Sequence, residues 1–383
     1  MSRSRFFPVR SLCFGAALAW LAPLAQADGC PTPGQWQVAG GKTLTTADLM
    51  AKLAGAEVVL LGERHDRLDH HRWQLHTLAA LHAHRPQMMI GLEMLPREAQ
   101  PALDAWVAGE LDEAAFLEQS DWRRAWGFDP DLYLPILHFA RMQRIPLLAL
   151  NVTPALRGRL ASEGWEAVPE QQRFGITPPA PARPAYRASL AAIYAEHAAR
   201  DGDPADLERF IAAQLIWDRA MATALADAAA DGTLVAGLMG EGHLADGDGV
   251  PYQLDDLGLG EHRSLQPWTP GPDCQPPAAR ADALYVLGDE SAFQPPEPPR
   301  LGVLIGEHAE GVLVQGIAPG SVAEAAGLAE GDVIVTAAGR PMTQPADLIA
   351  VIGRQVPGTL LPLEIRRGGE RQEVLARFPP PAN

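Results

Sequence analysis

Two stretches decide the fold: Val58-Val59-Leu60-Leu61-Gly62-Glu63-Arg64-His65 and, far downstream, Leu234-Val235-Ala236-Gly237-Leu238-Met239-Gly240-Glu241-Gly242-His243. Each begins with a run of apolar residues, which is typical of a buried strand. Each run is followed by the motif Gly-Glu-x-His. Because parallel strands of an α/β sheet end at one edge, we expect the two motifs to lie side by side.

The surrounding sequence predicts an α/β fold, a mostly parallel sheet flanked by helices, because strand-like and helix-like segments alternate. We expect strands at residues 57–61, 88–92, 146–150, 233–239, 262–266 and 283–287. We expect helices beginning near Thr45 and at about 69–83, 97–108, 112–119, 130–142, 185–200 and 204–230. Residues 28–45 are expected to be a loosely structured lead-in, and the proline-rich residues 164–184 an excursion.

Polar residues follow each of the first four predicted strands: Glu63 and His65, Glu93, Asn151, and Glu241 with His243. Four polar strand ends indicate a common site. Carboxylates and imidazoles together allow binding of zinc, manganese or cobalt, general acid–base catalysis, or binding of an iron cofactor such as haem. In the metal-binding alternative the ligands are His65, His243, Glu63 and Glu93.

The first 27 residues have the features of a secretory signal peptide, which predicts a periplasmic protein. Arginines precede the apolar residues 12–24, and Ala25-Gln26-Ala27 is a small-x-small cleavage site. Cys30 and Cys274 remain after cleavage, and an oxidising compartment favours a disulfide between them. The alternative is a lipid anchor on Cys30, although the three preceding residues make a poor lipidation signal.

The chain is acidic, with a formal charge of −16 over 383 residues. Loss of the arginine-bearing leader makes the mature protein more acidic still. Nucleic acid and anionic lipid are therefore poor candidates as partners.

The C-terminal part is a separate compact domain after a proline-rich stretch. We expect strands at 301–305, 312–317, 359–366 and 371–378, and helices from Ser321 to near 327 and at 345–355. The run from 312 to 342, with Ala318-Pro319-Gly320-Ser321 and Gly331-Asp332-Val333-Ile334, resembles a PDZ domain of the bacterial, periplasmic-protease type. The resemblance implies that Leu301-Gly302-Val303 binds a peptide C-terminus and that Leu348 and Ile352 form pocket walls. The alternative is an internal spacer or a dimer contact.

Four motifs together resemble the ChaN-like family of haem-binding, iron-regulated uptake proteins: residues 60–65, Gly91-Leu92-Glu93-Met94, Leu148-Ala149-Leu150-Asn151 and Gly240-Glu241-Gly242-His243. That family belongs to a superfamily with Tiki proteases, TraB-like proteins and erythromycin esterase-like enzymes. The resemblance covers about residues 45–265. It implies a haem pocket built on Glu63, His65, Glu93 and His243, with Glu241 as an additional member.

The same resemblance implies that haem is held between protomers, and so a homodimer, with a tyrosine as iron ligand. Tyr133 is our choice for this tyrosine, and Tyr186 and Tyr194 are the alternatives.

Three further features weigh on the site. The five histidines between 70 and 84 include no pair at the i, i+4 spacing, so we expect them mainly at the surface, with His70 nearest the pocket. Trp122 and Trp126 flank two arginines, which suits either core packing or a propionate-bearing macrocycle. No Gly-x-Ser-x-Gly motif and no free cysteine with a partner support a serine or cysteine nucleophile.

These observations predict a signal peptide (1–27), a ChaN-like α/β domain (28–266), a proline-rich linker (267–300) and a PDZ domain (301–379). The first hypothesis is a periplasmic haem- or iron-binding protein for haem or iron uptake, whose PDZ domain binds a protein partner or a C-terminal peptide. The alternative is a metal-dependent hydrolase or peptidase whose PDZ domain recruits substrate C-termini. A scaffold that has lost its ligand ranks last, because all motif residues are present.

Overall fold

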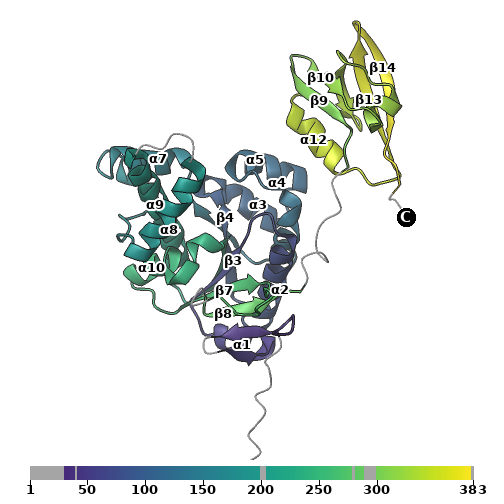
Figure 1. The fold of residues 1–383 in the computed structure, drawn as a ribbon. Helices are drawn as coiled ribbons and strands as arrows, with labels where there is room; N and C mark the ends of the chain where they lie inside the picture. Colours follow the sequence, from purple (N-terminus) through teal and green to yellow (C-terminus); the bar gives the residue numbers. More distant parts are fainter. Residues whose placement is uncertain (1–29, 39–40, 199–203, 278–280, 289–298, 381–383) are drawn as a thin grey trace, which may run out of the picture. The chain divides into compact units, whose positions relative to one another are not determined.

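The structure is a computed structural model that describes residues 30–38, 41–198, 204–277, 281–288 and 299–380 (Figure 1). The chain divides into two compact units, Met1–Ala292 and Phe293–Asn383. Each unit has a hydrophobic core of its own. In the described parts of the chain, no helix has the length and apolarity needed to cross a membrane. The expected signal peptide lies outside the described residues.

A mostly parallel sheet forms the centre of the first unit. Its strands in the described residues are β1 (Trp36–Val38), β2 (Lys42–Leu44), β3 (Val58–Glu63), β4 (Met88–Pro96), β5 (Leu147–Asn151), β6 (Leu234–Gly240), β7 (His262–Trp268) and β8 (Ala283–Val286). Their order is β2-β1-β8-β7-β3-β6-β4-β5. The strands from β8 to β5 are parallel, whereas β1 is antiparallel to both neighbours. The predicted α/β architecture is therefore confirmed.

Helices cover both faces of this sheet (Figure 1). The α-helices are α1 (Thr46–Leu53), α2 (Leu68–His84), α3 (Gln100–Ala108), α4 (Glu113–Gln119), α5 (Trp122–Ala125), α6 (Leu134–Gln143), α7 (Pro154–Glu163), α8 (Pro184–Ala198), α9 (Pro204–Ala229) and α10 (Val250–Asp256). Short 3-10 helices are η1 (Arg97–Ala99), η2 (Pro130–Leu132), η3 (Glu170–Gln172), η4 (Glu241–His243) and η5 (Ala245–Gly247).

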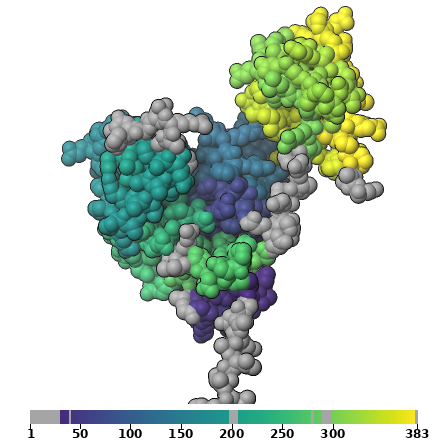
Figure 2. Space-filling model, in the orientation of Figure 1, coloured from purple at the N-terminus to yellow at the C-terminus, as the bar shows by residue number. Residues whose placement is uncertain are grey.

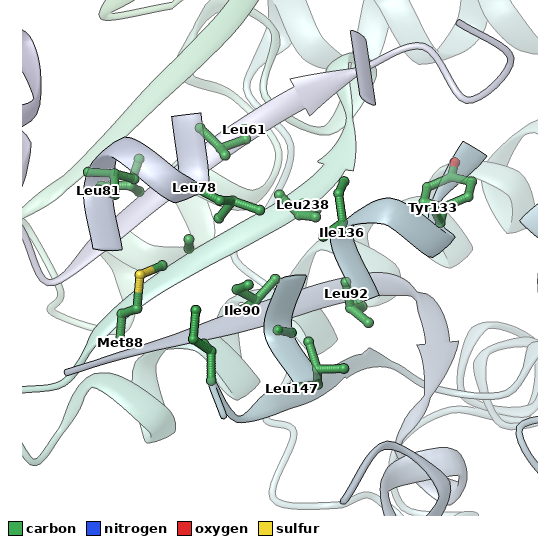
Figure 3. Close-up of a cluster of buried hydrophobic side chains, with 14 of the residues drawn as sticks. Leu61, Leu78, Leu81, Met88, Ile90, Leu92, Tyr133, Ile136, Leu147 and Leu238 are labelled. Carbon is green, nitrogen blue, oxygen red and sulfur yellow. The ribbon is translucent and has the colours of Figure 1, made fainter. Parts of the chain in front are cut away.

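The alternation of side chains along β3 explains how both faces are buried. Leu61 joins a core with α2, α3 and α6, part of which is drawn in Figure 3. Leu60, its neighbour, packs in a second core with Leu225 of α9 and Leu254 of α10. Successive side chains of a strand point to opposite faces, so a continuous apolar run is what a two-sided core requires.

The segments before and after this core differ from the expected loops. The lead-in at 28–45 contains β1 and β2, which form a hairpin joined to β8. Residues 267–300 are expected to be a linker, but they contain β8. This strand agrees with the one predicted at 283–287. Cys30 and Cys274 form the expected disulfide, with their Cα atoms 4.9 Å apart.

The second unit is an antiparallel β domain with two helices, as expected. Its elements in the described residues are β9 (Val303–His308), β10 (Gly311–Ile317), α11 (Val322–Ala326), β11 (Val333–Ala337), β12 (Arg340–Pro341), α12 (Pro345–Gly353), β13 (Leu360–Arg367) and β14 (Glu370–Arg377). The strand order is β14-β13-β11-β10-β9, so β9 lies at an edge. An edge strand has hydrogen-bonding groups available for a further strand.

Candidate functional site

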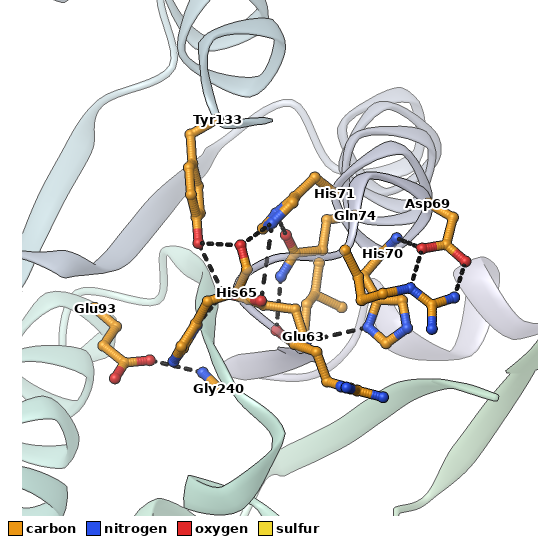
Figure 4. A network of polar contacts seen from close by, with 12 residues as sticks. Glu63, His65, Asp69, His70, His71, Gln74, Glu93, Tyr133 and Gly240 are labelled. Carbon is orange, nitrogen blue, oxygen red and sulfur yellow. Dashed lines mark hydrogen bonds and ion pairs between the residues drawn. The ribbon is translucent and has the colours of Figure 1, made fainter. Parts of the chain in front are cut away.

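The carboxyl ends of β3, β6, β4 and β5 meet at one edge, because these strands are consecutive neighbours in the sheet. They bring together the four residues expected at the centre of the site: Glu63, His65, Glu93 and His243 (Figure 4 labels the first three). Asn151 has a supporting place, since its amide donates to the backbone carbonyl of Glu93 at 3.1 Å.

Glu63 and His65 form the first carboxylate–histidine pair. Nδ1 of His65 lies 2.7 Å from Oε1 of Glu63, which is buried (Figure 4). The hydroxyl of Tyr133 donates to the same oxygen at 3.2 Å. Burial disfavours the imidazolium, but the hydrogen bond and charge of Glu63 outweigh it and raise the pKa of His65. A carboxylate in this position fixes the imidazole ring and its tautomer.

Histidines of α2 complete this half of the site, so the expectation that they lie mainly at the surface is wrong for two of them. His71 is buried, with Nε2 3.1 Å from the carbonyl oxygen of His65 and 3.9 Å from Oε2 of Glu63. His70 is also buried and accepts from the backbone N–H of Arg64. Burial lowers the pKa of His70 to about 4. His71, rather than His70, is therefore the nearer of the two to Glu63.

Glu93 and His243 form the second pair, and a residue that the sequence did not single out completes it. Oε1 of Glu93 lies 3.3 Å from Nε2 of His243. The other ring nitrogen, Nδ1, lies 2.6 Å from Oδ1 of Asp218 on α9. The hydroxyl of Tyr186 donates to Oδ2 of Asp218 at 2.7 Å. Tyr186 on α8, Asp218 on α9, His243 and Glu93 on β4 therefore form one row of polar contacts, the Asp218–His243–Glu93 chain with Tyr186 at its end.

The charges in this chain depend on one another. Burial disfavours the imidazolium, but the carboxylates of Glu93 and Asp218 raise the pKa of His243 to about 10. Burial also disfavours the carboxylate of Glu93, yet His243 holds the pKa of Glu93 below its usual value. For Asp218, burial dominates and raises the pKa. The chain can thus hold and move a proton at Nδ1 or Nε2 of His243.

A cavity of about 350 Å³ opens at this edge. Its lining residues come from the two Gly-Glu-x-His motifs and from one aromatic side chain: Glu63, Arg64, His65, Asp66, Phe128, Gly240, Glu241 and Gly242. Phe128 is exposed, and its ring centroid lies 5.0 Å from that of His65. In Figure 2, the purple part of the chain, which includes β3, reaches the surface between the teal and the blue parts. The cavity therefore combines an imidazole, an aromatic wall and two glycines.

The tyrosines considered as iron ligands lie apart from the cavity lining. Tyr133 is 2% exposed and lies behind Glu63, and Tyr186 is 6% exposed and is bound to Asp218. Tyr194 packs against Phe210 on α9, with ring centroids 5.5 Å apart.

The tryptophan–arginine cluster divides between the core, the neighbourhood of His65 and the surface. Trp122 is buried in the core. Trp126 packs edge-on against His65, with ring centroids 4.6 Å apart. Arg123 and Arg124 are exposed, and Arg124 pairs with Asp121.

The metal-binding alternative finds no support in the described residues, where no three His, Cys, Asp or Glu side chains are grouped to hold a metal ion. The close contacts of these side chains are instead hydrogen bonds and ion pairs within each pair.

In the second unit, the loop before β9 packs closely against the start of α11. Gly302 adopts φ +81°, and a Cβ there would lie 2.3 Å from Cβ of Ser321. The carbonyl groups of Leu301 and Gly302 accept from Ala323 and Ala318. Leu301, Leu348 and Ile352 are buried in the domain core, Val303 is half-buried, and Leu304 and Ile349 are the exposed apolar side chains of β9 and α12.

Comparison with protein families gives two matches. Residues 49–254 match the family described as haem-binding uptake, Tiki superfamily, ChaN. Residues 299–376 match the PDZ domain family. A comparison with curated proteins gives no match.

Two solved structures are similar to parts of the chain. The chain is similar to ChaN of Campylobacter jejuni, a structure titled for cofacial haem binding, with 17% identity and a TM-score of 0.52. That match covers 65% of this chain and 95% of the other, and it supports the fold. The PDZ domain of HtrA3 with a phage-derived ligand is 26% identical, covers 20% of this chain and 82% of the other, and has a TM-score of 0.19.

Proposed function

The chain belongs to the haem-binding uptake family of the Tiki superfamily, ChaN, and on this premise we propose that it binds haem at the cavity beside His65. The observation that carries the proposal is the His65 imidazole, held at Nδ1 by Glu63 and lining the cavity with Phe128. We further propose that the protein acts in the periplasm in haem or iron uptake, as its leader sequence predicts.

The residues present fit such a group. Haem is flat and largely apolar, and the cavity offers Phe128 as an aromatic wall and Gly242, where a Cβ would meet nothing within 4 Å and a flat group can approach the backbone. Oε2 of Glu63 and Oε1 of Glu93 are buried and accept no hydrogen bond among the described residues, and their nearest charged neighbours are His71 at 3.9 Å and His243 at 3.3 Å. Bound haem would supply an iron centre, and His65 is the imidazole placed to ligate it.

His65 suits the role of iron ligand better than Tyr133. The phenol of Tyr133 is buried, and burial together with the charge of Glu63 raises its pKa, which disfavours the phenolate that iron binds. Nδ1 of His65 contacts Glu63, which leaves Nε2 as the ring nitrogen for a ligand.

Haem titration of the full chain tests the proposal. We expect a Soret shift that saturates near one haem per chain, and at least about tenfold weaker binding in His65→Ala. His76→Ala is the matched control, because His76 is exposed on the same protein. Absence of a Soret shift in the unaltered protein would rule out the haem function, and equal affinity of His65→Ala would remove His65 as the ligand.

The cavity also suits haem held between two copies, with one haem bound by each copy. Arg64, Asp66 and Phe128 are exposed at its rim, so one side of a bound haem would face solvent. A second copy would cover that side. Light scattering with and without haem tests this, and a mass that stays that of a single chain at saturating haem contradicts it.

For the PDZ domain we propose binding of a peptide or protein C-terminus at Leu301-Gly302-Val303, with the peptide added as a strand to β9. No N–H of Leu301 or Gly302 donates to a backbone carbonyl in the described residues, so both are available to a carboxylate. Peptides with a free and an amidated C-terminus test this. Equal affinity for the two forms contradicts capture of the carboxylate.

A second candidate is a hydrolase that uses acid–base chemistry, and the Asp218–His243–Glu93 chain favours it. In this role His243 would transfer the proton and Asp218 would orient its ring. The test is hydrolysis of peptide and ester substrates by the full chain. Activity that survives in His243→Gln would exclude this role.

A further inference from the structure

Arg157 is a half-buried cation near the candidate site, and it forms no hydrogen bond or ion pair through its guanidinium with other described residues. It lies on α7, and its Cζ atom is 4.0 Å from the ring centroid of Trp217 on α9. Trp217 packs in turn against His243, with ring centroids 5.0 Å apart. The three side chains therefore form a continuous row of contacts that leads to the end of the sheet.

The surroundings of Arg157 favour an anion. Burial lowers the pKa of its guanidinium, whereas the charge of Glu93 opposes the change, so the group is partly removed from water and near the site. A desolvated charge without a partner is costly. A guanidinium stacked on an aromatic ring keeps the N–H donors at its edge available, and these match a carboxylate in two parallel hydrogen bonds.

The cavity itself would repel a carboxylate. Glu63, Asp66 and Glu241 are among its lining residues. Arg64 also lines it, but Arg64 and Asp66 are both exposed, so water and salt screen their charges; the buried Glu63 and the half-buried Glu241 are screened less. An anionic part of a ligand is therefore more favourably placed at the Arg157 side of His243. Nε1 of Trp217 is buried there without a hydrogen-bond partner in the described residues, which adds a second donor.

We propose that Arg157, stacked on Trp217, binds a carboxylate of the ligand held at this site. The inference rests on the proposed haem function, because haem carries two carboxylates on flexible arms. In this arrangement, residues of α7 and α9 bind the charged part of the ligand. Residues at the ends of β3 and β6 bind its ring.

The test compares haem with haem dimethyl ester, which has the same iron and ring but no carboxylate. Both are titrated into the full chain, Arg157→Gln and the control Arg159→Gln, followed at the Soret band. Arg159 lies on the same helix and contacts Glu163 and Gln172 instead. We expect Arg157→Gln to weaken haem binding about tenfold or more and to leave the ester unaffected. Arg159→Gln should change neither affinity.

Arg157→Lys keeps the positive charge but loses the planar guanidinium that can form two parallel hydrogen bonds. This variant tests the proposal if Arg157→Gln does not fold. We expect an affinity for haem between those of the unaltered protein and Arg157→Gln, again with no change for the ester. Equal loss for haem and ester in either variant, or no loss for haem, overturns the assignment. If the unaltered protein binds neither probe, the haem function fails and this inference with it.

Discussion

His243 is a half-buried imidazole between two buried carboxylates, and its charge should make stability depend on pH. Its pKa in the folded protein is about 10, compared with an ordinary value of 6.5. A group whose pKa is raised on folding stabilises the folded state fully below its unfolded pKa. That contribution is then lost as the pH rises through the folded pKa.

We therefore expect His243→Gln to lower the free energy of unfolding by on the order of 2–4 kcal/mol at pH 6. The difference from the unaltered protein should shrink between about pH 6.5 and 10. Urea denaturation at pH 6, 8 and 10 measures it, and His76→Gln, at an exposed position, should show no such trend. A difference that is constant from pH 6 to 10 would contradict the charged state of His243.

The gathering of Glu63, His65, Glu93 and His243 could be predicted from the sequence, because each follows a strand-like run and parallel strands end together. Asp218 could not be placed in the same way. It lies in the long helix α9, and helical periodicity does not tell which turn meets the end of β4. The sequence did contain one indication that Asp218 has a role. It is a charged residue next to Trp217 in a largely apolar helix, and the structure shows that it is buried.

At the scale of the element, the end of β6 depends on a glycine. A Cβ on Gly240 would lie 2.8 Å from Cε1 and 3.1 Å from Nε2 of His65. We expect Gly240→Ala to displace the His65 ring and to weaken haem binding about tenfold or more, with a stability loss of about 1–3 kcal/mol. Gly242→Ala is the control, because a Cβ there meets nothing within 4 Å. Equal haem affinity of both variants would show that the position of this ring does not matter for binding.

The PDZ loop gives a second prediction at this scale. Gly302 combines φ +81° with a Cβ position 2.3 Å from Cβ of Ser321, so alanine is excluded both by its backbone and by its side chain. We expect Gly302→Ala to reduce the affinity for free-carboxylate peptides at least about tenfold and to destabilise the domain by about 2 kcal/mol. Fluorescence anisotropy measures the affinity. Gly353→Ala, at the end of α12 with nothing within 4 Å, should bind as the unaltered protein does.

Element prediction succeeded where apolar periodicity was long and failed where it was short. The helix predicted at 204–230 is α9 (Pro204–Ala229), and the strand at 233–239 is β6 (Leu234–Gly240). The hairpin of β1 and β2 was expected as irregular chain, since each strand has three residues and glycines lie between them. Its pairing depends on β8, about 250 residues further along, which no local pattern reveals.

At the scale of the whole molecule, the second unit has a hydrophobic core separate from those of the first, so the chain has two folding units. One covalent link belongs to the first of them. The disulfide between Cys30 and Cys274 lies within Met1–Ala292. It closes a loop of 244 residues that contains nearly all of the sheet. A cross-link of this kind stabilises chiefly by limiting the unfolded chain.

We expect Cys30→Ser with Cys274→Ser to reduce the stability of the first unit by about 2–4 kcal/mol and to leave the PDZ domain unchanged. Calorimetry of the full chain measures both, because units with separate cores unfold in separate transitions. Reduction of the unaltered protein should lower the same transition, and a reductant added to the double variant should have no further effect. A shift of the PDZ transition in the double variant would show that the two units unfold as one.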